Sequence, residues 1–174
     1  MATDNQTESE WLWVADIRIS SRAVAVVDPM SWDHVDVELE PGEYAARIRT
    51  LQYGEESEPR VSRIQFLRKR RRGTIGEMIG EVGVDAATVG ILDVNALDPE
   101  LARQQTDYEE TLNESWQSDK TSGVVKWGPG DDDEMVHVRS GFGDGTYPIR
   151  ELLDAGARVG FEIQFIDPSD PQPF

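Results

Sequence analysis

Aspartates at the ends of predicted strands are the residues of this sequence best suited to do chemistry. Asp85 and Asp93 bracket one apolar segment, Asp28 precedes Pro29, and Asp144 lies among glycines. If strand pairing brings Asp85, Asp93 and Asp144 together, their oxygens would suit Ca²⁺ or Mg²⁺, and a metal-dependent hydrolase becomes one hypothesis. Their spacing matches no loop of known metal geometry. The alternative is that each aspartate caps a turn by accepting hydrogen bonds from nearby backbone.

Other catalytic groups are scarce. The chain has no cysteine and two histidines, His34 and His137, which both fall on the outward faces of predicted strands. The absence of cysteine excludes disulfides, thiolate nucleophiles and zinc sites with cysteine ligands. A histidine dyad needs a nucleophile and an orienting carboxylate beside the imidazole, and the sequence indicates neither. We therefore predict no catalytic residue, and no cofactor other than the Ca²⁺ or Mg²⁺ of the first hypothesis.

Five adjacent basic residues form the most unusual charge feature of the chain: Arg68, Lys69, Arg70, Arg71 and Arg72. The pattern predicts that they form the tip of a hairpin after a strand over residues 61–67. No aromatic residues alternate with them, as they would in a site for single-stranded nucleic acid. Two interpretations stay open, a solvated tip that balances local acidic charge and a surface that binds an acidic protein partner.

The chain as a whole is acidic. Its 174 residues include 17 Lys and Arg against 34 Asp and Glu, which gives a net charge of −17. A field of this sign repels nucleic acid and anionic membrane surfaces, so we expect neither as a partner. The apolar runs are far shorter than the ~20 residues of a membrane-spanning helix, and the first ten residues have no signal-peptide pattern. We therefore expect a protein of the cytoplasm.

Alternating apolar and polar residues predict mostly β structure. The alternation is clearest over residues 34–40, and over residues 11–19 it places Trp13 and Ala15 on one face. Pro41 and Gly42 fit the centre of a type II turn, which would join two strands in a hairpin. Residues 88–94 form an apolar run that predicts a buried strand.

Two short helices are predicted at about 97–116. Asp98 and Pro99 fit the start of one, and Thr106 and Glu109 form the capping box of the other. We expect a mostly β (α+β) protein, an antiparallel sandwich or rolled sheet with the helices at one edge. Residues 11–166 would form one domain, between a disordered tail over residues 1–10 and a proline-rich tail over residues 167–174.

Four segments, in this order, carry a resemblance to a bacterial family. They are VAVVDPM (24–30), VELEPGEYAARIR (37–49), VGVDAATVGILD (82–93) and SGFGDGTYPI (140–149). Over residues 22–166 the chain resembles the DUF4241 family, whose members carry a DP turn, a PGxYxV hairpin, a VDSGT-like strand entry and a GxGDGxYPV motif. It departs from that pattern at 86–87, where two alanines replace Ser-Gly. It departs again at 150–156, where a helix-like sequence replaces a strand and a glycine-containing turn.

The resemblance implies no enzymatic activity, because none is assigned to that family. It implies an accessory or immunity-type protein, which is an association and not a mechanism. We therefore expect a non-enzymatic module that binds a protein partner. Two alternatives stay open, the metal-dependent hydrolase and a structural subunit of a larger assembly.

Overall fold

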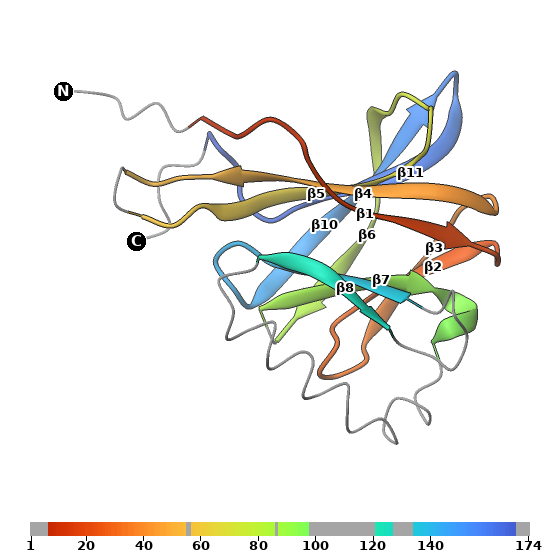
Figure 1. The fold of residues 1–174 in the computed structure, drawn as a ribbon, viewed down its shortest axis with the longest axis horizontal. Helices are drawn as coiled ribbons and strands as arrows, with labels where there is room; N and C mark the ends of the chain where they lie inside the picture. Colours follow the sequence, from red (N-terminus) through yellow and green to blue (C-terminus); the bar gives the residue numbers. More distant parts are fainter. Residues whose placement is uncertain (1–6, 55–56, 86, 98–120, 127–133, 170–174) are drawn as a thin grey trace.

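The chain folds into two antiparallel β-sheets packed face to face (Figure 1). The computed structural model describes residues 7–54, 57–85, 87–97, 121–126 and 134–169. The six-stranded sheet has the order β1 (Leu12–Ile19), β4 (Gly42–Leu51), β5 (Arg60–Arg68), β11 (Ala157–Gln164), β10 (Gly145–Asp154), β6 (Thr74–Val84). The five-stranded sheet has the order β3 (His34–Glu38), β2 (Ala23–Val27), β7 (Thr88–Asp93), β9 (Glu134–Arg139), β8 (Ser122–Lys126). The prediction of a mostly β, antiparallel protein is confirmed.

Apolar side chains from both sheets fill the space between them. Tyr44 and Phe66 stack with their ring centroids 5.1 Å apart, and Phe66 lies 5.6 Å from Phe161, its cross-strand partner on β11. The facing sheet contributes Val89 and Ile91 of β7, a strand that is buried along its whole length. Burying each of these large side chains stabilises the fold by about 2 kcal/mol, so this layer is the core.

The chain crosses from one sheet to the other at Pro41 and Gly42. The predicted alternation before this point is confirmed, since Val37 and Leu39 are buried and their polar neighbours are exposed. The predicted hairpin is wrong, because the strand before Pro41 belongs to the five-stranded sheet and β4 belongs to the other. Gly42 has φ 157°, not the value near +80° that a type II turn requires. The strand β3 pairs instead with β2.

Two other predicted local structures are wrong. The strand before the basic run, β5, lies inside the six-stranded sheet, and the strand after it, β6, lies at the sheet edge. The run is therefore a link between separated strands and not a hairpin tip. Residues 150–156, with their helix-like pattern, continue β10 and turn at Ala155 and Gly156, whose φ angles are 50° and 81°. The helix-like structure predicted for residues 150–156 is therefore wrong, because these residues form the end of a strand and a glycine-containing turn.

The helices predicted at about 97–116 fall almost entirely on residues 98–120, which lie outside the described residues. The part of the chain that the structure describes contains one helical element, the 3₁₀ turn η1 (Val94–Ala96). Asp93 caps this turn, because its carboxylate accepts a hydrogen bond from the backbone of Asn95.

A register shift in β1 turns Trp13 away from the core. Trp13 lies opposite Arg47 and Ala15 lies opposite Ala46, so Val14 is one extra residue on β1. Ala15 is buried as predicted, whereas Trp13, predicted to share its face, is 68% exposed on the outer side of the sheet.

We predict that Gly160→Ala destabilises the protein strongly. A Cβ at Gly160, inside β11, would overlap the carbonyl oxygen of Phe66 and lie 2.9 Å from the Cα of Leu67. Because both are backbone atoms of a paired strand, we expect a loss of about 3 kcal/mol in the free energy of unfolding by urea. Gly83→Ala is the matched control, since nothing lies within 4 Å of its Cβ position. Equal stabilities of the two variants would contradict the strand spacing described here.

Candidate functional site

Asp28 joins the β2–β3 turn to the link between β6 and β7. Its side chain is fully buried, and Oδ1 accepts hydrogen bonds from the backbone nitrogens of Met30 at 2.8 Å and Ser31 at 3.4 Å. Its Oδ2 accepts from the backbone nitrogen of Asp85 at 2.6 Å. The carboxylate therefore satisfies three backbone donors and connects two segments that are far apart in sequence.

Asp144 holds the same link from the other side. Its Oδ1 accepts a hydrogen bond from the backbone nitrogen of Ala87 at 3.0 Å, and the carbonyl of Ala87 accepts one from the nitrogen of Ser140 at 3.0 Å. The hydroxyl of Tyr147 donates to the carbonyls of Ser140 and Gly143. The glycine-rich segment thus forms a hydrogen-bonded turn that fixes the point where the chain changes sheets.

Asp93 lies at the opposite end of β7. Its Oδ2 accepts hydrogen bonds from the backbone nitrogens of Ser20 at 2.7 Å and Ser21 at 3.1 Å, and its Oδ1 accepts from Asn95 at 2.9 Å. Burial alone would raise the pKa of Asp93, but these hydrogen bonds outweigh it and hold the pKa below its usual value.

The predicted metal ligands are not brought together. Asp85 and Asp93 are separated by the whole of β7, and Asp85 contributes only its backbone nitrogen to the Asp28 junction while its side chain is exposed. Within the described ranges, no group of three His, Asp or Glu side chains is placed to hold a metal ion. Asp28 and Asp93 accept hydrogen bonds from the backbone two residues on, as the capping interpretation expects, whereas Asp144 accepts one from Ala87, which is distant in sequence.

The basic run binds acceptors of its own chain at three of its five positions. The Nζ of Lys69 lies 2.6 Å from Asp16, the Nε of Arg71 lies 2.7 Å from Asp154, and Arg68 donates to the carbonyl of Pro41 at 3.3 Å. The hydrogen bond to Asp16 raises the pKa of Lys69, and the bond from Lys69 lowers that of Asp16. These contacts fix the link between β5 and β6 onto the sheet.

The two histidines differ in environment. His34 is exposed and lies 3.6 Å from Asp36. His137 lies on the outer side of the five-stranded sheet, as predicted, but it is only 5% exposed, so the prediction of a surface histidine is wrong. Glycines stand opposite it on both neighbouring strands, Gly90 on β7 and Gly123 on β8. Burial, with a smaller contribution from the charge of Arg139, lowers the pKa of His137 to about 4.

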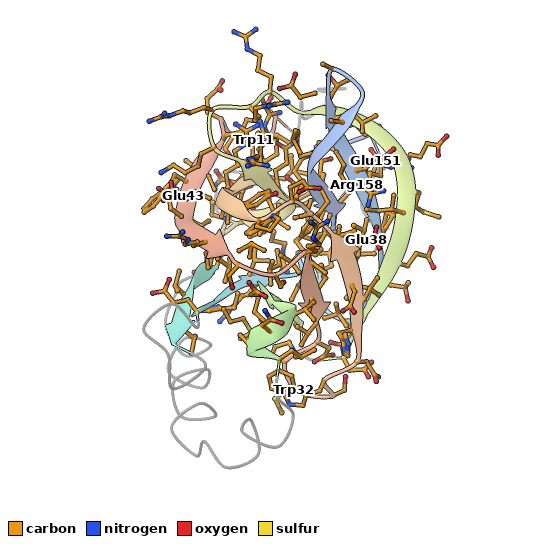
Figure 2. All side chains as sticks on the ribbon, turned by 90° about the vertical axis from the view of Figure 1, so that its right-hand side faces the viewer. Trp11, Trp32, Glu38, Glu43, Glu151 and Arg158 are labelled. Atoms are coloured by element: carbon orange, nitrogen blue, oxygen red, sulfur yellow. The ribbon has the colours of Figure 1, made fainter. Side chains whose placement is uncertain are left out.

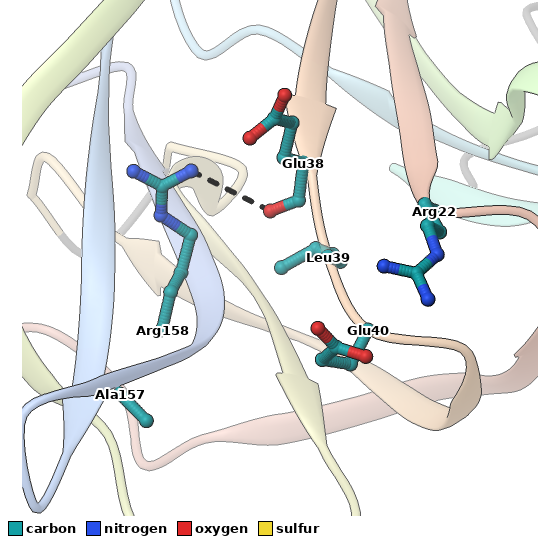
Figure 3. Close-up of a pocket in the computed structure, with 6 residues that line it drawn as sticks. All are labelled: Arg22, Glu38, Leu39, Glu40, Ala157 and Arg158. Carbon is teal, nitrogen blue, oxygen red and sulfur yellow. Dashed lines mark hydrogen bonds between the residues drawn. The ribbon is translucent and has the colours of Figure 1, made fainter.

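A charged cleft of about 410 Å³ lies between the end of β3 and the β10–β11 hairpin (Figure 3). Arg158 is held by Glu151 at 3.1 Å and donates to the carbonyl of Glu38 at 3.5 Å. Figure 2 shows these three residues together on one flank. Arg22 enters from the opposite wall, next to Glu40 (Figure 3). The sequence analysis missed this cleft, because only the topology brings β3 and β11 together.

The outer face of the six-stranded sheet carries a second feature that the sequence analysis missed. One residue from each strand lies directly opposite the next, in the row Trp13, Arg47, Gln65, Glu162, Arg150 and Met78. The two ends of the row are exposed, Trp13 at 68% and Met78 at 52%. The middle is polar and well packed, since Glu162 is 2% exposed. The alternation along each strand indicates which residues face outward, but not which ones meet across the sheet.

Comparisons with known proteins identify no relative: no family model matches the chain, no curated protein is detectably similar, and no solved structure matches it. Among the described residues, no helix has the length and apolar character that crossing a membrane requires. The residues and their geometry are therefore the basis for the functional proposal.

We predict that His137 makes the protein less stable in mild acid. Its neutral form is favoured in the folded state, where the pKa is about 4 against an ordinary value of 6.5. The stabilisation is therefore complete above pH 6.5 and is lost as the pH falls towards 4. Between pH 7 and pH 4.5, the free energy of unfolding of the wild type should fall about 2–3 kcal/mol more than that of His137→Gln. His34→Gln, which changes the exposed histidine, is the control variant. If the free energy of unfolding of His137→Gln falls with pH as steeply as that of the wild type, His137 is not the cause of the acid sensitivity.

Proposed function

We propose that this protein is a non-enzymatic module of the bacterial cytoplasm that binds another protein. Its resemblance to the DUF4241 family suggests an accessory or immunity-type role. One observation carries the proposal: large apolar side chains are exposed at both ends of the outer face of the six-stranded sheet.

Met78 belongs to the edge strand β6 and shares the outer face with Ile75, which lies opposite Leu152 and is 47% exposed. Leu152 is itself buried in a small cluster with Leu67. The exposed side chains therefore extend an existing apolar cluster. Trp13 supplies the other end of the face, and Trp and Met are enriched in the contact regions of protein interfaces.

A binding function is favoured over the metal-dependent hydrolase because of where the candidate groups lie. Asp93 and Asp144 accept backbone hydrogen bonds at opposite ends of β7, and His137 is buried on the sheet. The described residues that line the charged cleft include arginines and glutamates but no histidine, serine or threonine. A structural role in a larger assembly stays the second alternative, and it would use the same outer face.

We predict that a photo-crosslinking amino acid at position 78 captures a specific protein in native cells. Met30 is the matched control position, because it is 56% exposed against 52% for Met78 and lies in the β2–β3 turn, away from the outer face. The same crosslinked species should form from position 13, since Trp13 lies at the other end of the row.

Adding Ile75→Ser should reduce the yield of the product crosslinked from position 78, because an apolar contact beside that position is lost. The substitution should leave the fold intact, because Ile75 is exposed. Identical products from positions 30 and 78, or products from neither position 78 nor position 13, would contradict the proposed function.

A further inference from the structure

We infer that the partner segment that docks on this face is acidic as well as apolar, and that arginines between Trp13 and Met78 bind its carboxylates. This inference rests on the proposed function and names the chemistry of the partner. The geometry points to it because three of the four arginines of the face, Arg47, Arg49 and Arg63, are held by other side chains before any partner arrives.

The first of these arginines is fixed by a chain of hydrogen bonds across three strands. Arg47 donates to Oε1 of Gln65 through Nε at 3.1 Å and a terminal nitrogen at 2.7 Å. Gln65 in turn donates to Glu162 at 2.6 Å. Because Gln65 and Glu162 are both buried, their hydrogen bonds fix the position of the Arg47 guanidinium.

A second set of contacts holds Arg49 and Arg63. Glu8 lies 2.8 Å from Nε of Arg63 and 3.4 Å from Arg49, and Arg63 also reaches Glu162 at 3.2 Å. Trp11 stacks on two guanidinium groups, those of Arg47 and Arg49, with each 4.7 Å from its ring. Glu8 belongs to the segment that the sequence assigned to a tail, and in the structure it helps to fix these arginines.

The middle of the face is therefore basic, although the chain has a net charge of −17. Four arginines (Arg47, Arg49, Arg63 and Arg150) share it with two glutamates (Glu8 and Glu162), while Asp16 beside Trp13 and Glu81 opposite Pro148 add negative charge towards the two ends of the row. Arg150 stands beside Met78 in the row and makes no ion pair with another described residue. An acidic segment with apolar side chains complements this pattern of arginines flanked by Trp and Met.

The net charge argues for a short acidic segment rather than a long polyanion or a second copy. Nucleic acid would extend beyond the arginines into the repulsive field of the rest of the chain. Two copies of this chain, each at −17, also repel one another. A protein segment confined to the face meets mainly the local positive charge, and this attraction weakens as salt shortens the Debye length from about 10 Å at 0.1 M to about 3 Å at 1 M.

The test uses labelled heptapeptides, Glu-Leu-Glu-Leu-Glu-Leu-Glu and the same peptide with Lys in place of Glu, titrated with the full chain by fluorescence anisotropy. We expect the glutamate peptide to bind more tightly than the lysine peptide, opposite to the preference that the net charge alone would give. Arg150→Gln and Met78→Ser should each weaken that binding roughly three- to tenfold. The matched controls Arg22→Gln and Met30→Ser change exposed residues elsewhere and should leave it unchanged.

Tighter binding of the lysine peptide, binding of neither peptide, or equal losses in Arg150→Gln and Arg22→Gln would overturn the inference. Tighter binding of a single-stranded oligonucleotide, or a dimer in sedimentation that Arg150→Gln dissociates, would also overturn it. These failures are separate from that of the proposed function, because a basic protein crosslinked at position 78 would leave the binding role standing and refute the acidic partner alone.

Discussion

The buried carboxylate of Asp28 fixes the point at which the chain passes between the two sheets, and the rest of the sandwich depends on that passage. One oxygen of Asp28 accepts a hydrogen bond within the turn between β2 and β3. The other accepts a hydrogen bond from the backbone nitrogen of Asp85, just after β6. Asp144 accepts a hydrogen bond from the backbone nitrogen of Ala87, on the opposite side of the same link. Because the backbone nitrogens of Asp85 and Ala87 are both hydrogen-bonded, β7 starts in a fixed position. The sheet that it centres can then pack its apolar face on Tyr44 and Phe66.

This junction gives a physical reason for the motifs in the sequence. Three segments that the sequence analysis singled out supply it: the turn with Asp28 and Pro29, the strand entry with Asp85, and the glycine-rich segment with Asp144. The carboxylates of Asp28 and Asp144, which suit metal ligands by residue type, accept hydrogen bonds from backbone nitrogens in this structure. Residues at special turns can therefore serve the fold, while the surface that we propose for binding lies elsewhere, on the outer face of the six-stranded sheet.

Most strands were predictable from the sequence, although the end of β10 was not, but the partners of the strands were not predictable. Alternation identified the buried side chains of β3, and a continuous apolar run identified β7, since both patterns depend only on local spacing. The crossing at Pro41–Gly42 depends on which sheet each strand joins, and no local pattern encodes that choice. The burial of His137 required knowing that Gly90 and Gly123 would stand beside it. The row of arginines on the outer face was hidden for the same reason, because its members come from strands that pair only after folding.

The free energy of unfolding of Asp28→Ala, compared with that of Asp85→Ala, tests the junction most directly. Removing the Asp28 carboxylate leaves three backbone donors without their acceptor, so we predict a loss of at least about 2 kcal/mol. Asp85→Ala keeps the backbone nitrogen that Asp28 binds and removes only an exposed side chain, so it should stay within about 0.5 kcal/mol of the wild type. Equal losses in the two variants, together with stabilisation of the wild type alone by Ca²⁺ or Mg²⁺, would contradict the account and favour a metal site.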